Sequence, residues 1–259
     1  MILFDSHAHL DIYKQKETGF IINNADLVGV KFILSIGDGV ESSLKTLELS
    51  KESKNIFAAC GIHPHDAQSS TDEDLEELEK IIKEKAVVAV GETGLDFFKN
   101  YSPEEKQINL FKRHIEVARR RKKPLIVHCR DAYDKTLEIL KKENAYEPGV
   151  IFHCYSGSLE IARKLFNENC YFSAAGPLTF QNAYKLREIF TKIPLEKILI
   201  ETDCPYLSPH PLRGKRNEPA NLVYTAKKLA EIRSIKMEEL SKILFQNTLR
   251  AFKLKVDQD

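Results

Sequence analysis

The chain has 259 residues, of which 42% are hydrophobic and 30% are charged, and its formal net charge is +1. This composition supports a sizeable core beneath a well-solvated surface, and it excludes both a disordered chain and a long basic face for non-specific nucleic-acid binding. Five cysteines without a C-x-x-C pair argue against a disulfide framework and a structural zinc knuckle, which indicates a reducing compartment.

Short apolar runs recur along the whole chain and predict eight strands. Several of these runs are apolar at consecutive positions, as parallel strands are when helices cover one face and a barrel interior covers the other. We place the strands at residues 2–4, 32–36, 56–61, 87–90, 125–127, 150–152, 171–174 and 198–200.

Segments between the strands carry helix signals. Ser102, Pro103 and the two glutamates that follow predict a helix start with Ser102 as the N-cap. Ser158 precedes a similar apolar stripe, and residues 72–82 repeat the spacing. Residues 205–219 are expected to form a loop, and 221–253 two or three closing helices. Strand then helix, eight times, predicts an α/β fold, a (β/α)8 TIM barrel with extra C-terminal helices, and residues 1–259 as a single domain.

Six potential metal ligands follow these strands: His7, His9, Glu92, His128, His153 and Asp203. Residues that follow parallel barrel strands meet at one mouth of the barrel. His7 and His9 are two apart on an extended segment, so both imidazoles can approach one ion. Six ligands exceed the usual three of a catalytic zinc ion and suit two divalent ions, with Glu92 as the bridge. Zinc, magnesium and manganese all tolerate such ligands.

The charge of this predicted site indicates its substrate. Two divalent ions bring four positive charges, and Glu92 and Asp203 return only two negative ones. The site therefore remains cationic and would attract an anion such as a phosphodiester. Asp203, as ligand and proton acceptor, is the candidate general base for a metal-activated water, and Glu92 is the second candidate catalytic residue.

Six blocks of sequence carry a family resemblance: DSHAHL from residue 5, GIHPH from 61, GETGLD from 91, HCRDA from 128, HCYSG from 153 and ETDCPY from 201. In this order they resemble the TatD family of metal-dependent deoxyribonucleases, from end to end of the chain. The resemblance implies a TIM barrel of the amidohydrolase superfamily and a two-metal hydrolase acting on DNA ends. It also implies that His7, His9, Glu92 and Asp203 hold one ion, and Glu92, His128 and His153 the other.

Several neighbouring residues admit more than one interpretation. His63 either lies beside the substrate phosphate or braces its loop with His65, and Arg130 and Arg213 are candidate phosphate contacts. Glu201 shares a strand face with Asp203, so it could bind an additional ion, accept a hydrogen bond from a ligand histidine or form a structural ion pair.

Other residues near the motifs have mainly structural interpretations. His114 lies inside a predicted helix as a surface or packing residue. Strand alternation predicts that three cysteines that follow ligands face the helices as small buried hydrophobes: Cys129, Cys154 and Cys204. Four aromatic residues could stack on unpaired bases or pack the loops: Phe97, Phe98, Tyr155 and Tyr206.

We therefore expect a divalent-metal-dependent exonuclease acting on DNA ends or single strands. Two alternatives remain: the same centre could hydrolyse an ester, an amide or an aminoacyl-tRNA, or the chain could be a non-enzymatic metal-binding protein. No run approaches the roughly 18 apolar residues of a membrane span, and the first residues lack a signal-peptide pattern. We expect a cytoplasmic protein without a membrane partner, and a monomer is favoured.

Overall fold

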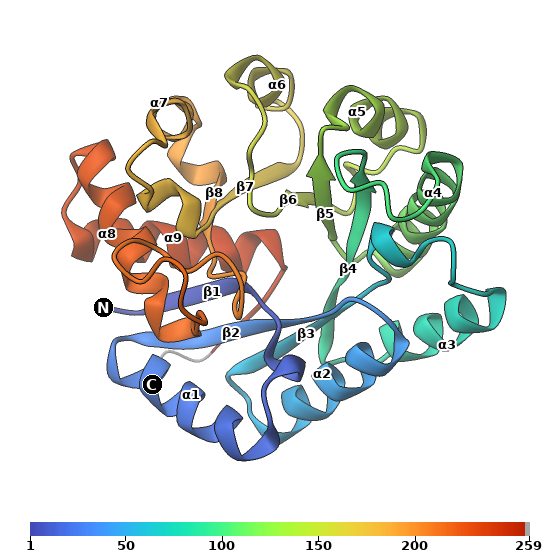
Figure 1. Cartoon of the computed structure of the whole chain (residues 1–259), viewed down its shortest axis with the longest axis horizontal. Helices are drawn as coiled ribbons and strands as arrows, with labels where there is room; N and C mark the ends of the chain where they lie inside the picture. Colours follow the sequence, from blue (N-terminus) through green and yellow to red (C-terminus); the bar gives the residue numbers. More distant parts are fainter. Residues whose placement is uncertain (257–259) are drawn as a thin grey trace.

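The computed structural model describes residues 1–256 and shows a ring of helices around a barrel of parallel strands (Figure 1). The strands pair in chain order, from β1 to β8. Their bounds are β1 Leu3–Ala8, β2 Val30–Gly37, β3 Ile56–Cys60, β4 Val87–Asp96, β5 Leu125–Arg130, β6 Val150–Phe152, β7 Cys170–Ala174 and β8 Ile198–Ile200. The predicted (β/α)8 barrel is confirmed, and β1, β4 and β5 extend beyond their predicted ends into the polar motifs.

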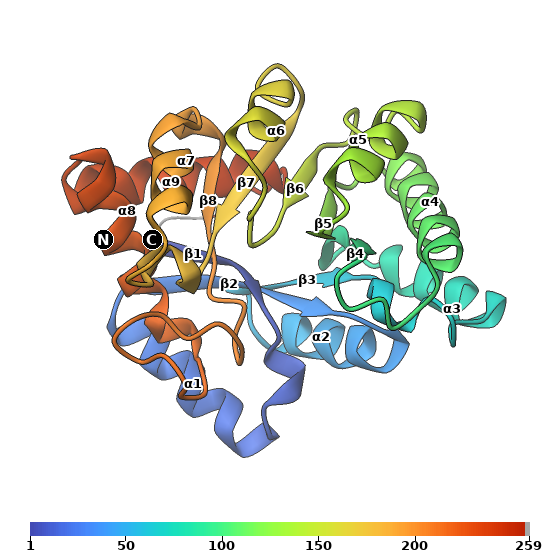
Figure 2. The same ribbon diagram turned by 45° about the horizontal axis from the view of Figure 1, so that its top comes forward.

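Helices fill the intervals between strands and surround them in both views (Figures 1 and 2). They are α1 Gln15–Leu27, α2 Val40–Glu52, α3 Asp72–Ile82, α4 Glu104–Arg121, α5 Tyr133–Lys142, α6 Leu159–Lys164, α7 Tyr184–Lys192, α8 Leu222–Arg233 and α9 Met237–Ala251. The last two are the predicted closing helices. None of the helices within residues 1–256 is long and apolar enough to cross a membrane.

The two serines that precede predicted helices have different roles. Ser158 caps α6, since its hydroxyl accepts a hydrogen bond from the backbone N–H of Ile161 at 3.1 Å. The prediction for Ser102 was wrong: Pro103 is the N-cap of α4, with no side-chain cap bond. The Ser102 hydroxyl instead donates to the carbonyl of His65 at 2.6 Å, which fixes the loop after β3.

Side chains alternate between the barrel interior and the layer under the helices. On β5, Ile126 belongs to the interior cluster and Val127 to the cluster beneath the helices. On β6, Ile151 lies inside in the same way. Because side chains two residues apart on a strand share a face, this alternation also directs His128 and His153 toward the barrel axis.

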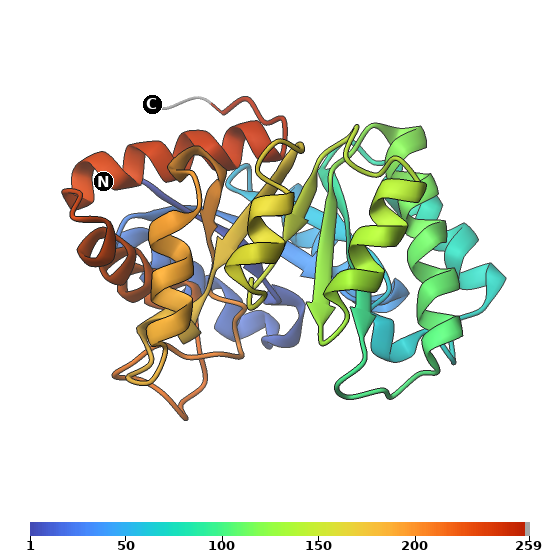
Figure 3. The ribbon, with the colours of Figure 1, turned by 90° about the horizontal axis from the view of Figure 1, so that it is seen from above.

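The two ends of the barrel differ. Figure 3 shows α9, in red, across the end from which β1 starts, and the orange segment between β8 and α8 at the opposite end. At the α9 end, Phe245 lies 5.6 Å from Phe32, whose ring is 5.7 Å from that of Phe4. This aromatic packing closes the amino end of the barrel.

The seam between the first and last strands orders the carboxyl end. The Asp5 carboxylate accepts a hydrogen bond from the backbone N–H of Thr202 at 2.9 Å. The backbone N–H of Asp203 donates to the carbonyl of His7 at 2.9 Å, and that of His9 donates to Cys204 at 2.8 Å. These bonds place Asp203 beside His7 at the end of β1 and His9 directly after it.

Candidate metal centre

The structure brings the six predicted ligands together at the carboxyl end of the barrel. Their ligand atoms form three groups within 4.8 Å: His7, His9 and Glu92; His7, His153 and Asp203; and Glu92, His128 and His153. All are buried except His128, which is partly exposed. Two of these groups match the two ligand sets that the family resemblance implies, apart from Asp203 in the first.

Glu92 lies between two pairs of histidines. Its Oε2 is 3.3 Å from His7 Nε2 and 3.7 Å from His9 Nε2. Its Oε1 is 2.9 Å from His128 Nδ1 and 2.8 Å from His153 Nε2. Each oxygen therefore faces its own pair, which is the arrangement of a carboxylate shared by two cation sites.

Asp203 borders the His7 and His9 side of this centre. Its Oδ1 lies 3.5 Å from His9 Nε2 and 3.6 Å from His7 Nε2. Burial would raise the pKa of Asp203, but the hydrogen bond to His9 and the neighbouring histidine charges outweigh it, so the pKa is lowered. Asp203 is thus ionised over the neutral pH range.

Shifts in strand register lie at two of the ligand motifs, those of β1 and β4. The β1–β2 register shifts between Asp5 and Ala8, and the β4–β5 register shifts between Val90 and Thr93, directly at the histidine and glutamate motifs. Gly94 follows at φ +140°, where an added Cβ would meet the carbonyl oxygen of His128 at 2.0 Å. Only glycine allows β4 to approach β5 this closely beside the ligands.

The carboxylates determine the protonation of the histidines. At His9, burial lowers the pKa, but the hydrogen bond and charge of Asp203 raise it to about 9. At His153, Glu92 and Glu201 likewise outweigh burial and hold the pKa well above its usual value. Burial would raise the pKa of Glu92, but the charge of His153 and the hydrogen bonds of His128 and His153 hold it well below its usual value.

These buried groups fit a pair of divalent ions. Nε2 of His7 and Nε2 of His9 lie only 3.3 Å apart and both face Glu92, where two imidazoles need a shared proton or a cation. Each ring has its Nδ1 buried without a hydrogen-bond partner among the residues described. Nitrogen and carboxylate oxygen donors in this mixture suit zinc, magnesium or manganese.

Asp96 is a site residue that the sequence reasoning missed. This buried carboxylate accepts hydrogen bonds from His65 Nε2 at 2.9 Å and from His128 Nε2 at 3.1 Å. The backbone N–H of Lys99 also donates to it, at 2.8 Å. Because a carboxylate only accepts, His128 must donate through Nε2, which directs Nδ1 toward Glu92. A signal was present, since Asp96 and Glu92 are an even number of positions apart in one strand.

Glu201 contacts the ligand histidine His153 and the backbone beside it. Its Oε1 accepts a hydrogen bond from the backbone N–H of Cys154 at 2.7 Å and lies 3.3 Å from His153 Nδ1. Among the interpretations from sequence, the geometry favours an acceptor that orients a ligand histidine.

The three candidate substrate contacts surround the mouth. His63 Nε2 lies 3.5 Å from Glu92 Oε1, and its Nδ1 accepts the backbone N–H of His65 at 3.1 Å. The Arg130 guanidinium lies 4.0 Å from the centre of the Phe98 ring, and both side chains are exposed. Arg213 lies further out, on the segment between β8 and α8.

The predicted burial of the three cysteines that follow ligands is wrong for one of them. Cys129 and Cys204 are buried as predicted, and burial raises the pKa of Cys129 to about 12. Cys154 is half-buried and lines a pocket beside His153. The prediction for Cys154 was wrong because β6 ends at Phe152, and Cys154 adopts a φ of +41° beyond the strand.

Of the four aromatic residues after the motifs, two pack within the protein and two are exposed. Tyr155 is buried, and its hydroxyl donates to the carbonyl of Ser158 at 2.7 Å, so it packs the loop and is not available for stacking on a base. Phe97 packs against the core, whereas Phe98 and Tyr206 are more than half exposed.

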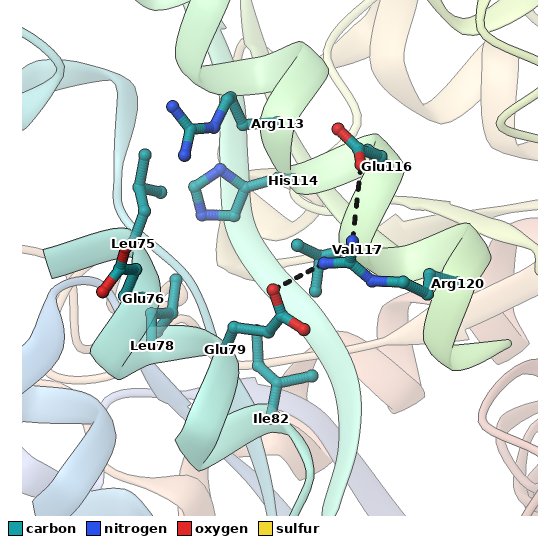
Figure 4. A pocket seen from close by; sticks show the side chains of 10 residues that line it. All are labelled: Leu75, Glu76, Leu78, Glu79, Ile82, Arg113, His114, Glu116, Val117 and Arg120. Atoms are coloured by element: carbon teal, nitrogen blue, oxygen red, sulfur yellow. Dashed lines mark hydrogen bonds and ion pairs between the residues drawn. The ribbon is translucent and has the colours of Figure 1, made fainter. Parts of the chain in front are cut away.

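His114 is a packing residue. It is buried on α4, where Nδ1 donates to the Leu110 carbonyl at 2.9 Å and Nε2 accepts the backbone N–H of Ile62 at 3.0 Å. Figure 4 shows it at a small pocket between α3 and α4, near the ion pair of Glu79 and Arg120. Burial lowers the pKa of His114 to about 4, so the ring is neutral.

Comparison with known proteins identifies the family. The model of the "TatD related DNase" family matches residues 4–253. The chain belongs to the TatD family of metal-dependent hydrolases. It is 40% identical to the uncharacterized metal-dependent hydrolase YabD of Bacillus subtilis, over 98% of this chain and 100% of that protein. It is 38% identical to YcfH of Escherichia coli K12, described in the same words, over 97% and 96%.

A solved structure of a TatD homologue has the same fold. YjjV from Escherichia coli superposes with a TM-score of 0.92 at 29% identity, and the match covers 98% of each chain. The TatD relationship that the six sequence blocks indicated is therefore confirmed.

Proposed function

We propose that this TatD family member is a two-metal phosphodiesterase that cleaves DNA at ends or in single strands. The observation that carries the proposal is the position of Glu92, whose two oxygens face separate histidine pairs. Two ions held there would outnumber the charges of the ligand carboxylates, and the exposed Arg130 adds a positive charge at the mouth. An anionic phosphodiester matches this charge better than a neutral ester or amide.

Each ion would have its own ligands. His7, His9, Glu92 and Asp203 would hold one ion, and Glu92, His128 and His153 the other. When bound, two divalent ions would polarise a water molecule toward hydroxide and neutralise charge on the attacking and leaving oxygens of the phosphate. Glu201 and Asp96 would hold the rings of His153 and His128 in the orientation that ligation needs.

Two side chains are placed to move protons. Asp203 is ionised and lines the pocket beside the centre, so it could accept a proton from the attacking water. His63 accepts a hydrogen bond at Nδ1, so its neutral form carries a proton at Nε2, on the side of Glu92. That N–H can donate to a phosphate oxygen or to the leaving group.

An activity assay tests this function. The protein is treated with chelator, reloaded with zinc, magnesium or manganese, and incubated with end-labelled single-stranded and double-stranded DNA. We expect progressive shortening of the labelled strand, restored by at least one metal. A nitrophenyl acyl ester at equal metal is the control substrate. Turnover of the ester without loss of DNA length would instead support an acyl hydrolase of the same superfamily.

A further inference from the structure

A pocket of about 370 Å³ opens directly beside the candidate metal centre. Three of the proposed metal ligands line this pocket: His128, His153 and Asp203. Its lining also includes the apolar residues Ala175, Pro177, Leu186 and Leu207 and the polar residues Arg130 and Ser156. This pocket is therefore suited to the sugar and base of a nucleotide whose phosphate lies at the metal centre.

A second pocket, of about 500 Å³, continues from the first. Pro177 and Leu186 line both pockets, so they form a shared ledge between them. The second pocket, which we call the β7–β8 subsite, is further lined by Phe180, Gln181, Asn182, Ala183, His210 and Arg213. It lies between the segment that follows β7 and the one that follows β8.

Hydrogen bonds fix the walls of the β7–β8 subsite. The Arg187 guanidinium donates to the carbonyls of Phe180 at 2.7 Å and Gln181 at 3.0 Å. The Thr179 hydroxyl accepts the backbone N–H of His210 at 2.8 Å, which ties the two segments together. The subsite is thus formed before any substrate binds.

Arg213 is an available cation at this subsite. Its guanidinium lies 4.5 Å from the centre of the Phe180 ring, and it has no hydrogen bond or ion pair with the residues that the structure describes. Arg216 on the same segment differs, since it pairs with Glu17 at 3.2 Å. Stacking on an aromatic face leaves the N–H edges of a guanidinium free, and those edges match a phosphate group.

We propose that the β7–β8 subsite binds the phosphate next to the one that is cleaved, with Arg213 as the contact. The nucleoside between the two phosphates would lie on the Pro177 and Leu186 ledge. The inference rests on the proposed phosphodiesterase function and narrows its substrate class to nucleotide chains that carry at least one phosphate beyond the scissile bond. Isolated diesters are poorer substrates.

Small substrates of known length test the proposal. The unphosphorylated thymidine dinucleotide TpT is compared with the same dinucleotide carrying a phosphate at its 5′ end or at its 3′ end. One of the two phosphorylated forms, depending on cleavage polarity, is expected to exceed TpT about tenfold in kcat/KM, as a charge-assisted hydrogen bond allows. In Arg213→Gln this ratio is expected to fall to near one.

The matched control removes the same charge nearby. Lys185→Gln changes an exposed lysine of α7 that does not line either pocket, and it should retain the tenfold ratio. The proposal is overturned if neither terminal phosphate improves cleavage, or if Arg213→Gln and Lys185→Gln change the ratio equally.

A binding measurement separates this proposal from the proposed function. A fluorescein-labelled phosphorothioate oligothymidine, whose backbone resists cleavage, is titrated with the metal-loaded protein and followed by anisotropy. We expect Kd to rise about tenfold in Arg213→Gln and less than twofold in Lys185→Gln. Dependence of binding on Arg213 without cleavage of any dinucleotide or of end-labelled DNA would retain the subsite and refute the nuclease. Cleavage of DNA without dependence on Arg213 in either assay would retain the nuclease and refute the subsite.

Discussion

The two ends of this barrel are built from the same eight strands but contain opposite chemistry. At the amino end, rings of Phe4, Phe32 and Phe245 pack against one another beneath α9. At the carboxyl end, Glu92 and Asp203 are buried among histidines. Burying apolar rings stabilises a fold, whereas burying carboxylates destabilises it unless positive charge accompanies them. One end therefore supplies stability, and the other needs positive charge beside its carboxylates.

The strongest way to break this division is to remove the shared carboxylate. Glu92→Gln keeps the shape of the side chain but removes the charge that faces both histidine pairs. Since metal ions supply several kcal/mol of transition-state stabilisation, we expect DNA cleavage to fall about 10³-fold or more, together with bound metal. Metal content is measured by elemental analysis and cleavage with end-labelled DNA.

The control is Glu48→Gln, which makes the same change on the exposed surface of α2. It should alter neither metal content nor cleavage. Full metal content and activity in Glu92→Gln would refute its assignment as the bridge.

A substitution at the amino end should lower stability without affecting metal binding. Phe245→Ala removes a buried ring beneath the barrel and leaves a cavity, so we expect the free energy of unfolding to fall by about 3–5 kcal/mol. Urea unfolding measures this change. Metal bound per folded molecule should be unchanged, because the six predicted ligands all lie at the opposite end.

Phe20→Ala is the matched control, since Phe20 on α1 is 67% exposed. We expect it to change the free energy of unfolding by no more than about 0.5 kcal/mol. Loss of metal in folded Phe245→Ala would show that the two ends are coupled.

The division between the two ends explains what the sequence could predict. Apolar runs and helix spacing are local signals, so all eight strands were placed. Alternation also held within β5, where Cys129 is buried as predicted. The motifs of β1 and β4 are different, because register shifts at Asp5–Ala8 and Val90–Thr93 interrupt the alternation. Their ligands could be identified from their positions after the strands, but the direction of their side chains could not be predicted from the alternation.

Contacts between distant segments were also beyond the sequence. The spacing of Asp96 from Glu92 in β4 could have marked Asp96 as a site residue, but its hydrogen bond with His128, 32 positions away, could not be predicted from it. Cys154 was misplaced because the alternation was extended past Phe152, where β6 ends. Tertiary geometry, not residue type, decides these positions.

A smaller effect at the carboxyl end comes from Asp96, which orients a ligand without belonging to the proposed ligand set. Asp96→Asn exchanges an acceptor for an amide and weakens the constraint on the His128 ring. Outer partners of this kind contribute about 10- to 100-fold to metal affinity, so we expect a loss in that range by calorimetric titration with zinc. Asp66→Asn, on the exposed surface of the neighbouring loop, is the control. Unchanged zinc affinity in Asp96→Asn would limit Asp96 to bracing the His65 loop.

The smallest expected effect concerns His114, a buried histidine that has no carboxylate partner within residues 1–256, unlike the histidines beside Glu92. The pKa of His153 lies well above its usual value beside Glu92, whereas burial lowers the pKa of His114 to about 4. The unfolded chain binds this proton below about pH 6.5 and the folded protein does not, so the contribution of His114 is complete above pH 6.5 and declines as the pH falls toward 4. Relative to pH 7.5, about 1.4 kcal/mol of stability should be lost at pH 5.5 through this residue alone.

His114→Gln tests this effect, because an amide oxygen can still accept the backbone N–H of Ile62 but does not titrate. The variant should lose less stability than the wild type between pH 7.5 and 5.5 in urea unfolding. His210→Gln, on the exposed segment after β8, should follow the wild type. Equal losses in all three proteins would mean that His114 takes up a proton in the folded state, and burial alone would then not distinguish it from the histidines beside Glu92.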